Sequence, residues 1–314
     1  MLLRDFAEGD LAEGIHGPSQ SGDGWGPSSG GAGWQRTLIA EDHGEVLGMG
    51  TMLLSNVHRD SYYCEIQVEP EVRRQGVGRT LFDALLNCTP TPYPILTRAM
   101  ASQPARQAFA QSLGFDVLMR CPSPQLHPGS LATANWIERH RAPAGVRIVA
   151  AQERSFEEFL DAWVDLYVWI HEEWSPTVAR EVVHDMFAAS GMAEVDFELS
   201  QVAVVDDRIV ALACVLPDQW DNRSFLVTET VHRRTPSGTE ILGATIAAAL
   251  RACARRGIHF VEFDGHVVDP HYYPLAQTFP ITGADPLLVM RHPGRDCGSP
   301  DELRRAVLSG EQFR

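Results

Sequence analysis

The stretch that decides the fold is VEPEVRRQGVGRTL, residues 68–81, in which three arginines and two glycines fall within the seven residues from Arg73 to Arg79. It begins as a strand should end and finishes as a helix should begin. A helix N-terminus exposes unpaired backbone N–H groups and a partial positive charge, which favour a bound phosphate. Glycines at alternate positions let successive N–H groups converge on one anion. The pattern Arg73-x-x-Gly76-x-Gly78 therefore predicts a pyrophosphate-binding turn.

Two common nucleotide-binding loops do not fit this turn. It has only two glycines, so it is not a GxGxxG motif, and it lacks the Gly-Lys-Ser/Thr ending of a Walker loop. It resembles instead the acyl-CoA-binding motif of the GCN5-related N-acetyltransferases (GNAT), Val-x-Pro-x-x-Arg-(Arg/Gly)-x-Gly-x-Gly followed by a helix. The positions that match are Val68, Pro70, Arg73, Gly76, Gly78 and Leu81.

This resemblance implies acetyl-CoA as co-substrate, without a metal. In the family, backbone amides of the turn hold the pyrophosphate, and the preceding strand separates from its neighbour and pairs with pantetheine. The residues implicated here are Ile66, Gln67, Val68, Arg73, Arg74, Gln75, Gly76, Val77, Gly78, Arg79, Thr80 and Gln103.

The order of expected elements repeats along the chain. Apolar runs around Asp42-His43-Gly44 predict a hairpin, followed by a strand over 61–68, the turn and a helix over 79–88. At an offset of 160 residues, Arg73-Arg74 falls on Arg233-Arg234 and Gly78 on Gly238. One long period repeated twice indicates a duplicated domain. We therefore expect an α/β protein of two tandem GNAT-fold domains, each a mixed, mostly antiparallel sheet flanked by helices.

The expected boundaries follow composition. We expect a GNAT domain with the intact motif over 1–126, a Pro-rich polar linker over 127–145, a second GNAT-like domain over 146–295 and a C-terminal tail or helix over 296–314. In the second domain Pro236 stands at the first glycine position and has no backbone N–H to donate. We therefore expect the second domain to keep the fold and to bind CoA poorly.

The N-terminal region predicts one short helix within 4–16 and a mobile loop over 17–34, where seven glycines occur without an apolar period. The family usually builds part of its acceptor site from two helices after the first strand. Only the second half has room for both of them, so an acceptor pocket between the domains, covered by this loop, is the expectation.

Acyl transfer to an amine needs a base to take the amine proton, and an acid helps the thiolate to leave. Alternation along the strand puts Glu65 on the face opposite Cys64, and a carboxylate inside a central strand needs a partner or water. Glu65 is the candidate base, with a structural carboxylate as the alternative. Ala110 occupies the family's usual acid tyrosine position. Tyr63 is the candidate replacement, with Tyr62 as an alternative, unless the thiolate leaves unaided or the domain only binds CoA.

Composition narrows the function further. With 41 acidic and 26 basic residues, the net charge of −15 argues against a nucleic-acid partner and favours a cationic small substrate. Six scattered cysteines, the absence of an apolar span and an acidic N-terminus predict a cytoplasmic protein without a membrane partner. We expect acetyl transfer to an amine of a small molecule, such as a specialised metabolite or antibiotic. The alternatives are a non-catalytic acyl-CoA-binding or sensing protein and an O-acyl or longer-chain acyltransferase. A homodimer is left open.

Three histidines, His259, His266 and His271, lie close together in the sequence with Asp264 and Asp269. They match no metal-ligand spacing, and we interpret them as loop histidines.

Overall fold

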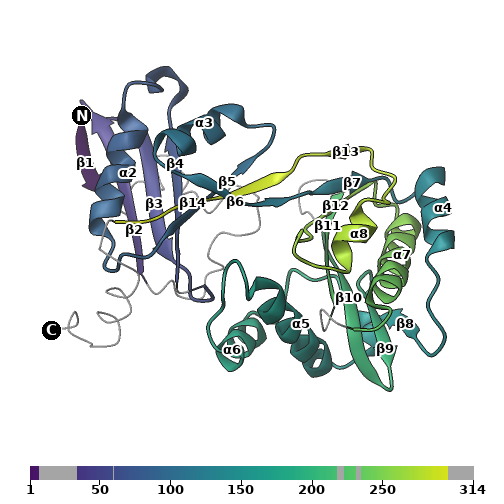
Figure 1. The fold of residues 1–314 in the computed structure, drawn as a ribbon. Helices are drawn as coiled ribbons and strands as arrows, with labels where there is room; N and C mark the ends of the chain where they lie inside the picture. Colours follow the sequence, from purple (N-terminus) through teal and green to yellow (C-terminus); the bar gives the residue numbers. More distant parts are fainter. Residues whose placement is uncertain (7–33, 59, 218–222, 231–234, 296–314) are drawn as a thin grey trace. The chain divides into compact units, whose positions relative to one another are not determined.

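The computed structural model describes residues 1–6, 34–58, 60–217, 223–230 and 235–295, with the backbone alone over 223–230. The chain forms two compact units (Figure 1). The first comprises Met1–Arg98, Ala105–Val117 and the chain from Met290 onward, and the second comprises Ala99–Pro104 and Leu118–Val289.

The first sheet has seven strands in the order β1-β2-β3-β4-β5-β14-β6. Strands β1 to β4 pair antiparallel, and β4 pairs parallel with β5. The elements of this part are β1 (Leu2–Asp5), β2 (Trp34–Asp42), β3 (Glu45–Leu54), β4 (Tyr62–Val68), the 3-10 helix η2 (Pro70–Val72), α2 (Val77–Cys88), β5 (Ile95–Met100), α3 (Pro104–Ser112), β6 (Asp116–Cys121) and β14 (Leu287–His292).

Local sequence explains the central elements of this sheet. His43 and Gly44 both take positive φ angles, 50° and 86°, which a two-residue hairpin turn requires. Helix α2 buries Leu81, Phe82 and Leu85 at helical spacing. The predicted hairpin, strand and helix are confirmed here, and α2 begins two residues earlier than expected.

The second sheet also has seven strands, in the order β13-β7-β12-β11-β10-β9-β8. Its parallel pair is β11 and β12. The elements are β7 (Pro124–Leu126), α4 (Leu131–Arg139), β8 (Arg147–Ala150), the 3-10 helix η3 (Ala151–Glu153), α5 (Phe156–His171), α6 (Arg180–Ser190), β9 (Gln201–Val205), β10 (Arg208–Pro217), β11 (Arg223–Thr230), α7 (Gly238–Arg256), β12 (Phe260–Phe263), α8 (Tyr272–Ala276) and β13 (Gly283–Ala284).

The two sheets correspond strand for strand, but each contains one strand from the other half of the sequence. Read from its other end, the second order is β8-β9-β10-β11-β12-β7-β13, and β7 takes the place that β14 has in the first sheet. The yellow-green colour of β14, among the purple to teal strands of the first sheet, shows this in Figure 1. The duplicated halves have therefore exchanged equivalent strands.

This exchange divides the chain differently from the expected boundaries. Strand β14 lies inside the range assigned to the second domain, and β7 lies inside the range assigned to the first. The expected linker also belongs to a core. Trp136 of α4 is fully buried, and its indole Nε1 donates to Thr278 Oγ1 at 2.9 Å. The prolines and polar residues of 127–145 had indicated a linker, so the buried position of Trp136 was not predicted.

The expected loop over 17–34 and most of the expected N-terminal helix lie outside the described residues. Trp34 begins β2, and Arg4 and Asp5, the first residues of that expected helix, belong to strand β1. Strand β1 was not predicted. Its pairing with β2 extends the first sheet by one antiparallel strand.

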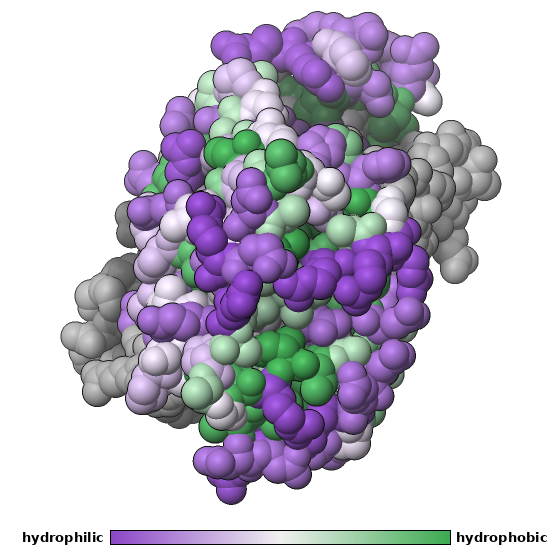
Figure 2. Space-filling view, turned by 90° about the vertical axis from the view of Figure 1, so that its right-hand side faces the viewer, coloured by the Kyte–Doolittle hydropathy of each residue, from purple (hydrophilic) through white to green (hydrophobic). Residues whose placement is uncertain are grey.

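Within the described part of the chain, no helix combines the length and apolar character needed to cross a membrane. Figure 2 shows a face on which hydrophilic side chains predominate and hydrophobic ones form separate groups. Such a mixed surface is ordinary for globular domains.

Candidate functional site

The turn between β4 and α2 has the backbone geometry of an anion-binding loop. Arg74 and Gly76 adopt left-handed conformations, with φ angles of 66° and 90°. Gly76 is the N-cap of α2 and, lacking a side chain, leaves the first N–H groups of the helix without a side-chain acceptor. A Cβ atom on Gly76 would meet no heavy atom within 4 Å. The turn is therefore open at Gly76 and fits the predicted pyrophosphate.

Polar side chains of the turn stabilise its shape. Arg73 Nε donates to the carbonyl oxygen of Val68 at 2.9 Å, which ties the turn to the end of β4. Arg79 donates to the carbonyl oxygen of Ser112 at 2.5 Å, and Gln75 Nε2 donates to that of Glu71 at 3.3 Å. The side chain of Thr80 bonds back to the carbonyl oxygen of Gly76. These predicted cofactor-binding residues come together in one exposed turn.

The second glycine of the motif has a different role. Gly78 is buried, and a Cβ atom there would lie 2.8 Å from Cζ of Phe109 on α3. Val77 is also buried. From the sequence we expected both glycines to leave room for a ligand. Only Gly76 borders open space, whereas Gly78 is required because helix α3 packs closely against α2.

Strands β4 and β5 separate next to this turn. Their parallel register consists of two pairs, Tyr62 with Ile95 and Tyr63 with Leu96. On its other edge β4 pairs with β3 over its full length. The segment from Ile66 to Val68 thus lies beyond the paired part of the β4 edge that faces β5. This is the geometry expected of a strand that offers its backbone to pantetheine.

The candidate base Glu65 is partly buried and has an ion-pair partner. Its Oε1 lies 3.4 Å from Arg106 on α3, and the two side chains are 25% and 35% exposed. Arg106 was not among the predicted residues, because 41 positions separate it from Glu65 and no local pattern connects them. Arg106 thus lies next to the carboxylate of Glu65, which the alternation of side chains along the strand had identified as the candidate base.

The tyrosines near Glu65 differ in their surroundings. Tyr62 is fully buried, and its hydroxyl lies 2.6 Å from Thr91 Oγ1, which gives it a packing role. The ring of Tyr63 lies 5.7 Å from the guanidinium carbon of Arg98. Ala110 is buried in α3 and offers no hydroxyl. Of the two tyrosines, Tyr63 is the one outside the core.

A cysteine next to the candidate base is poorly suited to act as a nucleophile. Burial, with a smaller effect from the charge of Glu65, raises the pKa of Cys64 to about 12. At neutral pH the thiol is protonated, and the thiolate is the reactive form. Cys64 is therefore not a candidate nucleophile.

Gln103 stands apart from the turn in its contacts. It is exposed, and its side-chain oxygen accepts a hydrogen bond from the backbone N–H of Met100 at 3.2 Å. It belongs to the second compact unit, and its assignment to cofactor binding remains a prediction.

The corresponding turn of the second domain is built differently. Helix α7 begins at Gly238, and its N-cap, Ser237, takes the left-handed conformation with φ of 54°. Pro236 stands where the first domain has Gly76, and a proline ring cannot adopt a φ of 90°. Gly238 keeps the packing role of Gly78, since a Cβ atom there would lie 2.5 Å from the ring of His271. The two turns thus share the close packing at the second glycine position and differ in the backbone at the first.

The three histidines lie in loops, as expected, but two of them are not at the surface. His266, Asp269 and His271 are all buried. Among the described residues, no group of three or more potential ligands could hold a metal ion.

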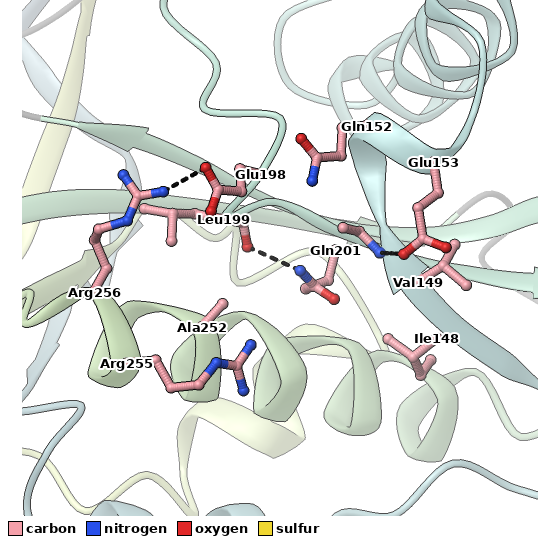
Figure 3. A pocket seen from close by; sticks show the side chains of 11 residues that line it. Ile148, Val149, Gln152, Glu153, Glu198, Leu199, Gln201, Ala252, Arg255 and Arg256 are labelled. Atoms are coloured by element: carbon pink, nitrogen blue, oxygen red, sulfur yellow. Dashed lines mark hydrogen bonds and ion pairs between the residues drawn. The ribbon is translucent and has the colours of Figure 1, made fainter.

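A cavity of about 570 Å³ lies in the second unit and is lined by β8, η3, the start of β9 and the end of α7 (Figure 3). Arg256 pairs with Glu198 at 2.6 Å, and Gln201 donates to the carbonyl oxygen of Leu199. Most of its polar groups thus bind one another, and none of the predicted site residues lines it.

Comparison with known proteins agrees with this geometry. Residues 33–117 match the family described as Acetyltransferase (GNAT) domain. This segment is a GNAT domain by its sequence match. A search of curated proteins gave no match for the chain.

Solved structures extend the fold to the rest of the chain. A tandem GNAT protein from the clavulanic acid biosynthesis pathway is 15% identical, with a TM-score of 0.59 and 84% of each chain covered. A GCN5-related N-acetyltransferase from Sphaerobacter thermophilus is 17% identical, with a TM-score of 0.57 and coverage of 94% of this chain and 97% of that one. A GCN5-related glucosamine N-acetyltransferase region of a fungal multi-domain GH3 β-N-acetylglucosaminidase is 12% identical, with a TM-score of 0.60, and covers 93% of this chain and 38% of that one. The tandem GNAT fold predicted from sequence is confirmed.

Proposed function

We propose that this GNAT protein transfers the acetyl group of acetyl-CoA to the amine of a small molecule, with the site in its first domain. The observation that carries the proposal is the open left-handed turn at Gly76, directly after the part of β4 that separates from β5. Backbone amides from Gln75 to Thr80 would hold the pyrophosphate, and the backbone of Ile66 to Val68 would pair with pantetheine. Acetyl-CoA would supply the activated thioester carbonyl.

Glu65 is the residue to which we assign the proton transfer. As the C–N bond forms and the C–S bond breaks, the amine proton passes to the Glu65 carboxylate, directly or through one water. Arg106 stabilises the ionised carboxylate before the reaction. Tyr63 remains the proposed acid, and without it the leaving thiolate takes its proton from water.

Native mass spectrometry of the purified protein tests the proposal most directly. We expect an acetyl-CoA adduct at one per chain and, with a panel of amines, an acetylated product. A longer copurified thioester or acetylation of alcohols would instead support the O-acyl or longer-chain alternative.

One observation favours the non-catalytic alternative. Ala110 is buried where the family usually has its acid tyrosine. In that case acetyl-CoA would bind with the same stoichiometry and no amine would be acetylated. Binding and turnover measured on the same preparation separate the two functions.

A further inference from the structure

Four buried polar atoms without a hydrogen-bond partner gather in two short segments of the second domain. They are Trp174 Nε1, just after α5, and Asp269 Oδ2, His271 Nε2 and the Tyr272 hydroxyl, where α8 begins. Asp269 and Tyr272 are 1% and 0% exposed, and His271 is 9% exposed. Each such atom carries a desolvation penalty, because burial removed its water without supplying a partner. The two segments meet at His266, whose ring lies 5.3 Å from that of Trp174 and whose carbonyl oxygen accepts from the backbone N–H of Asp269. We therefore asked which polar ligand these buried atoms could bind.

The loop before α8 fixes these groups in position. Asp269 Oδ1 accepts from the backbone N–H groups of His271 at 2.7 Å and Tyr272 at 3.1 Å. The other carboxylate oxygen is therefore left for a ligand. His271 Nδ1 lies 3.4 Å from Thr239 Oγ1, which leaves Nε2. The Tyr272 ring packs so closely on Gly265 that no side chain fits at that position.

Electrostatic interactions connect Asp269 with His271 and with Tyr272. Burial raises the pKa of Asp269, and the neighbouring His271 partly offsets this effect. Burial also raises the pKa of Tyr272, with further increases from the charges of Asp264, Cys121 and Asp269. A buried carboxylate surrounded in this way gains most from a cation.

Three rings lie beside this loop. The ring centroids of His171, Trp174 and His266 are 5.2 to 5.3 Å from one another. We call the rings of His171, Trp174 and His266 the ring triangle. The carbonyl oxygen of His266 accepts from the backbone N–H of Asp269 at 3.1 Å, which connects the ring triangle to the loop before α8. The exposed Glu172 and Glu173, next to Trp174 in sequence, add negative charge. The indole face of Trp174 favours a cation, and the three rings together offer a surface on which a flat apolar body can pack.

We propose that Asp269, His271 and Tyr272, together with the ring triangle, bind a small aromatic primary amine that also carries an oxygen. The three N–H groups of an ammonium match three acceptors, namely Asp269 Oδ2, Tyr272 Oη and His271 Nε2 in the tautomer whose Nδ1 donates to Thr239 Oγ1. Trp174 Nε1 donates to the oxygen of the ligand. The proposal concerns binding alone and does not depend on acetyl transfer in the first domain.

Tyramine is the probe, because it combines the ammonium, the aromatic ring and the phenol oxygen. Its matched control is 4-ethylphenol, which lacks only the amine. Titration of the full-length protein without CoA, followed by NMR at the Trp174 indole N–H signal, should give a saturable shift with tyramine. The variant Trp174→Phe identifies that signal and keeps a ring.

Asp269→Asn keeps an oxygen that can accept from the backbone N–H groups of His271 and Tyr272, and it removes the charge. We expect it to weaken tyramine binding at least about tenfold, as loss of a charge-assisted hydrogen bond does. The control is Asp206→Asn, the same change in an exposed hairpin turn of the same domain, where φ of 48° suits asparagine. It should leave binding unchanged.

Three results would overturn the proposal. They are equal shifts with tyramine and 4-ethylphenol, unchanged affinity in a folded Asp269→Asn variant, and no saturable shift with tyramine. In the last case a crystal structure should show ordered water on the four atoms, which would then be a structural water site.

Discussion

The carboxylate of Glu65 on β4 and the guanidinium of Arg106 on α3 form a partly buried ion pair at 3.4 Å. The pair lies next to the point where β4 and β5 separate. Arg106 orients the carboxylate, which can still be reached because a quarter of its side chain is exposed.

If Glu65 accepts the amine proton, Glu65→Gln should keep acetyl-CoA affinity and lose turnover by roughly 100-fold to 10,000-fold, the usual scale of general-base catalysis. The loss should shrink at high pH, because an amine that is already neutral no longer needs the base. Steady-state rates across pH and calorimetry with acetyl-CoA measure the two effects. Glu45→Gln, an exposed carboxylate at the start of β3, is the matched control. Turnover at the native rate in Glu65→Gln would exclude this role and direct attention to Tyr63.

A second prediction follows from the open turn at Gly76. Gly76→Asp should reduce acetyl-CoA affinity at least about tenfold, because a carboxylate there repels the pyrophosphate. Gly44→Asp is the matched control, since Gly44 has a similar φ of 86° and the same open surroundings in the β2–β3 turn. Calorimetry should show a loss in the first variant only. Equal affinities in the two folded variants would show that the anion binds elsewhere.

Stoichiometry tests the difference between the two turns. Since Pro236 supplies no N–H and cannot take the backbone angle of Gly76, one acetyl-CoA should bind per chain. Calorimetric titration gives this ratio directly. Two equivalent sites per chain would mean that the second domain binds CoA despite the proline.

The strand exchange predicts that the first sheet depends on the end of the chain. A chain that stops at residue 286 loses β14 and leaves β5 and β6 with unpaired edges. Hydrogen exchange should then show loss of protection across 95–121, together with loss of acetyl-CoA binding. A chain that stops at residue 295 keeps β14 and should behave as the full-length protein. Unchanged protection in the shorter chain would contradict the observed strand order.

Helix α4 provides a test of where the second core begins. Trp136→Ala should lower the free energy of unfolding by about 3 to 5 kcal/mol, because a fully buried indole and its hydrogen bond to Thr278 are lost. Leu131→Ala, at a 77% exposed position of the same helix, should change it by less than about 0.5 kcal/mol. Thermal or denaturant unfolding compares them. Similar stabilities would mean that 127–145 acts as the linker expected from its composition.

The sequence by itself determined the features that depend on neighbouring residues. Four features could be predicted because each rests on local backbone preference or periodic burial. They are the turn from Arg73 to Gly78, the hairpin at His43-Gly44, helix α2 and the duplication at an offset of 160 residues. Glu65 was also identified from the sequence, by the alternation of side chains along one strand. Neither its partner nor its role followed from that pattern.

Only the tertiary structure decided the features that join distant segments. Arg106 reaches Glu65, Phe109 makes Gly78 obligatory, and β14 enters the first sheet after more than half of the chain has intervened. Strand β7 has three residues and little pattern of its own, and either half offers β7 and β14 an equivalent place in a sheet. The choice between those places is made by packing and edge hydrogen bonds across the folded chain, which local sequence does not encode.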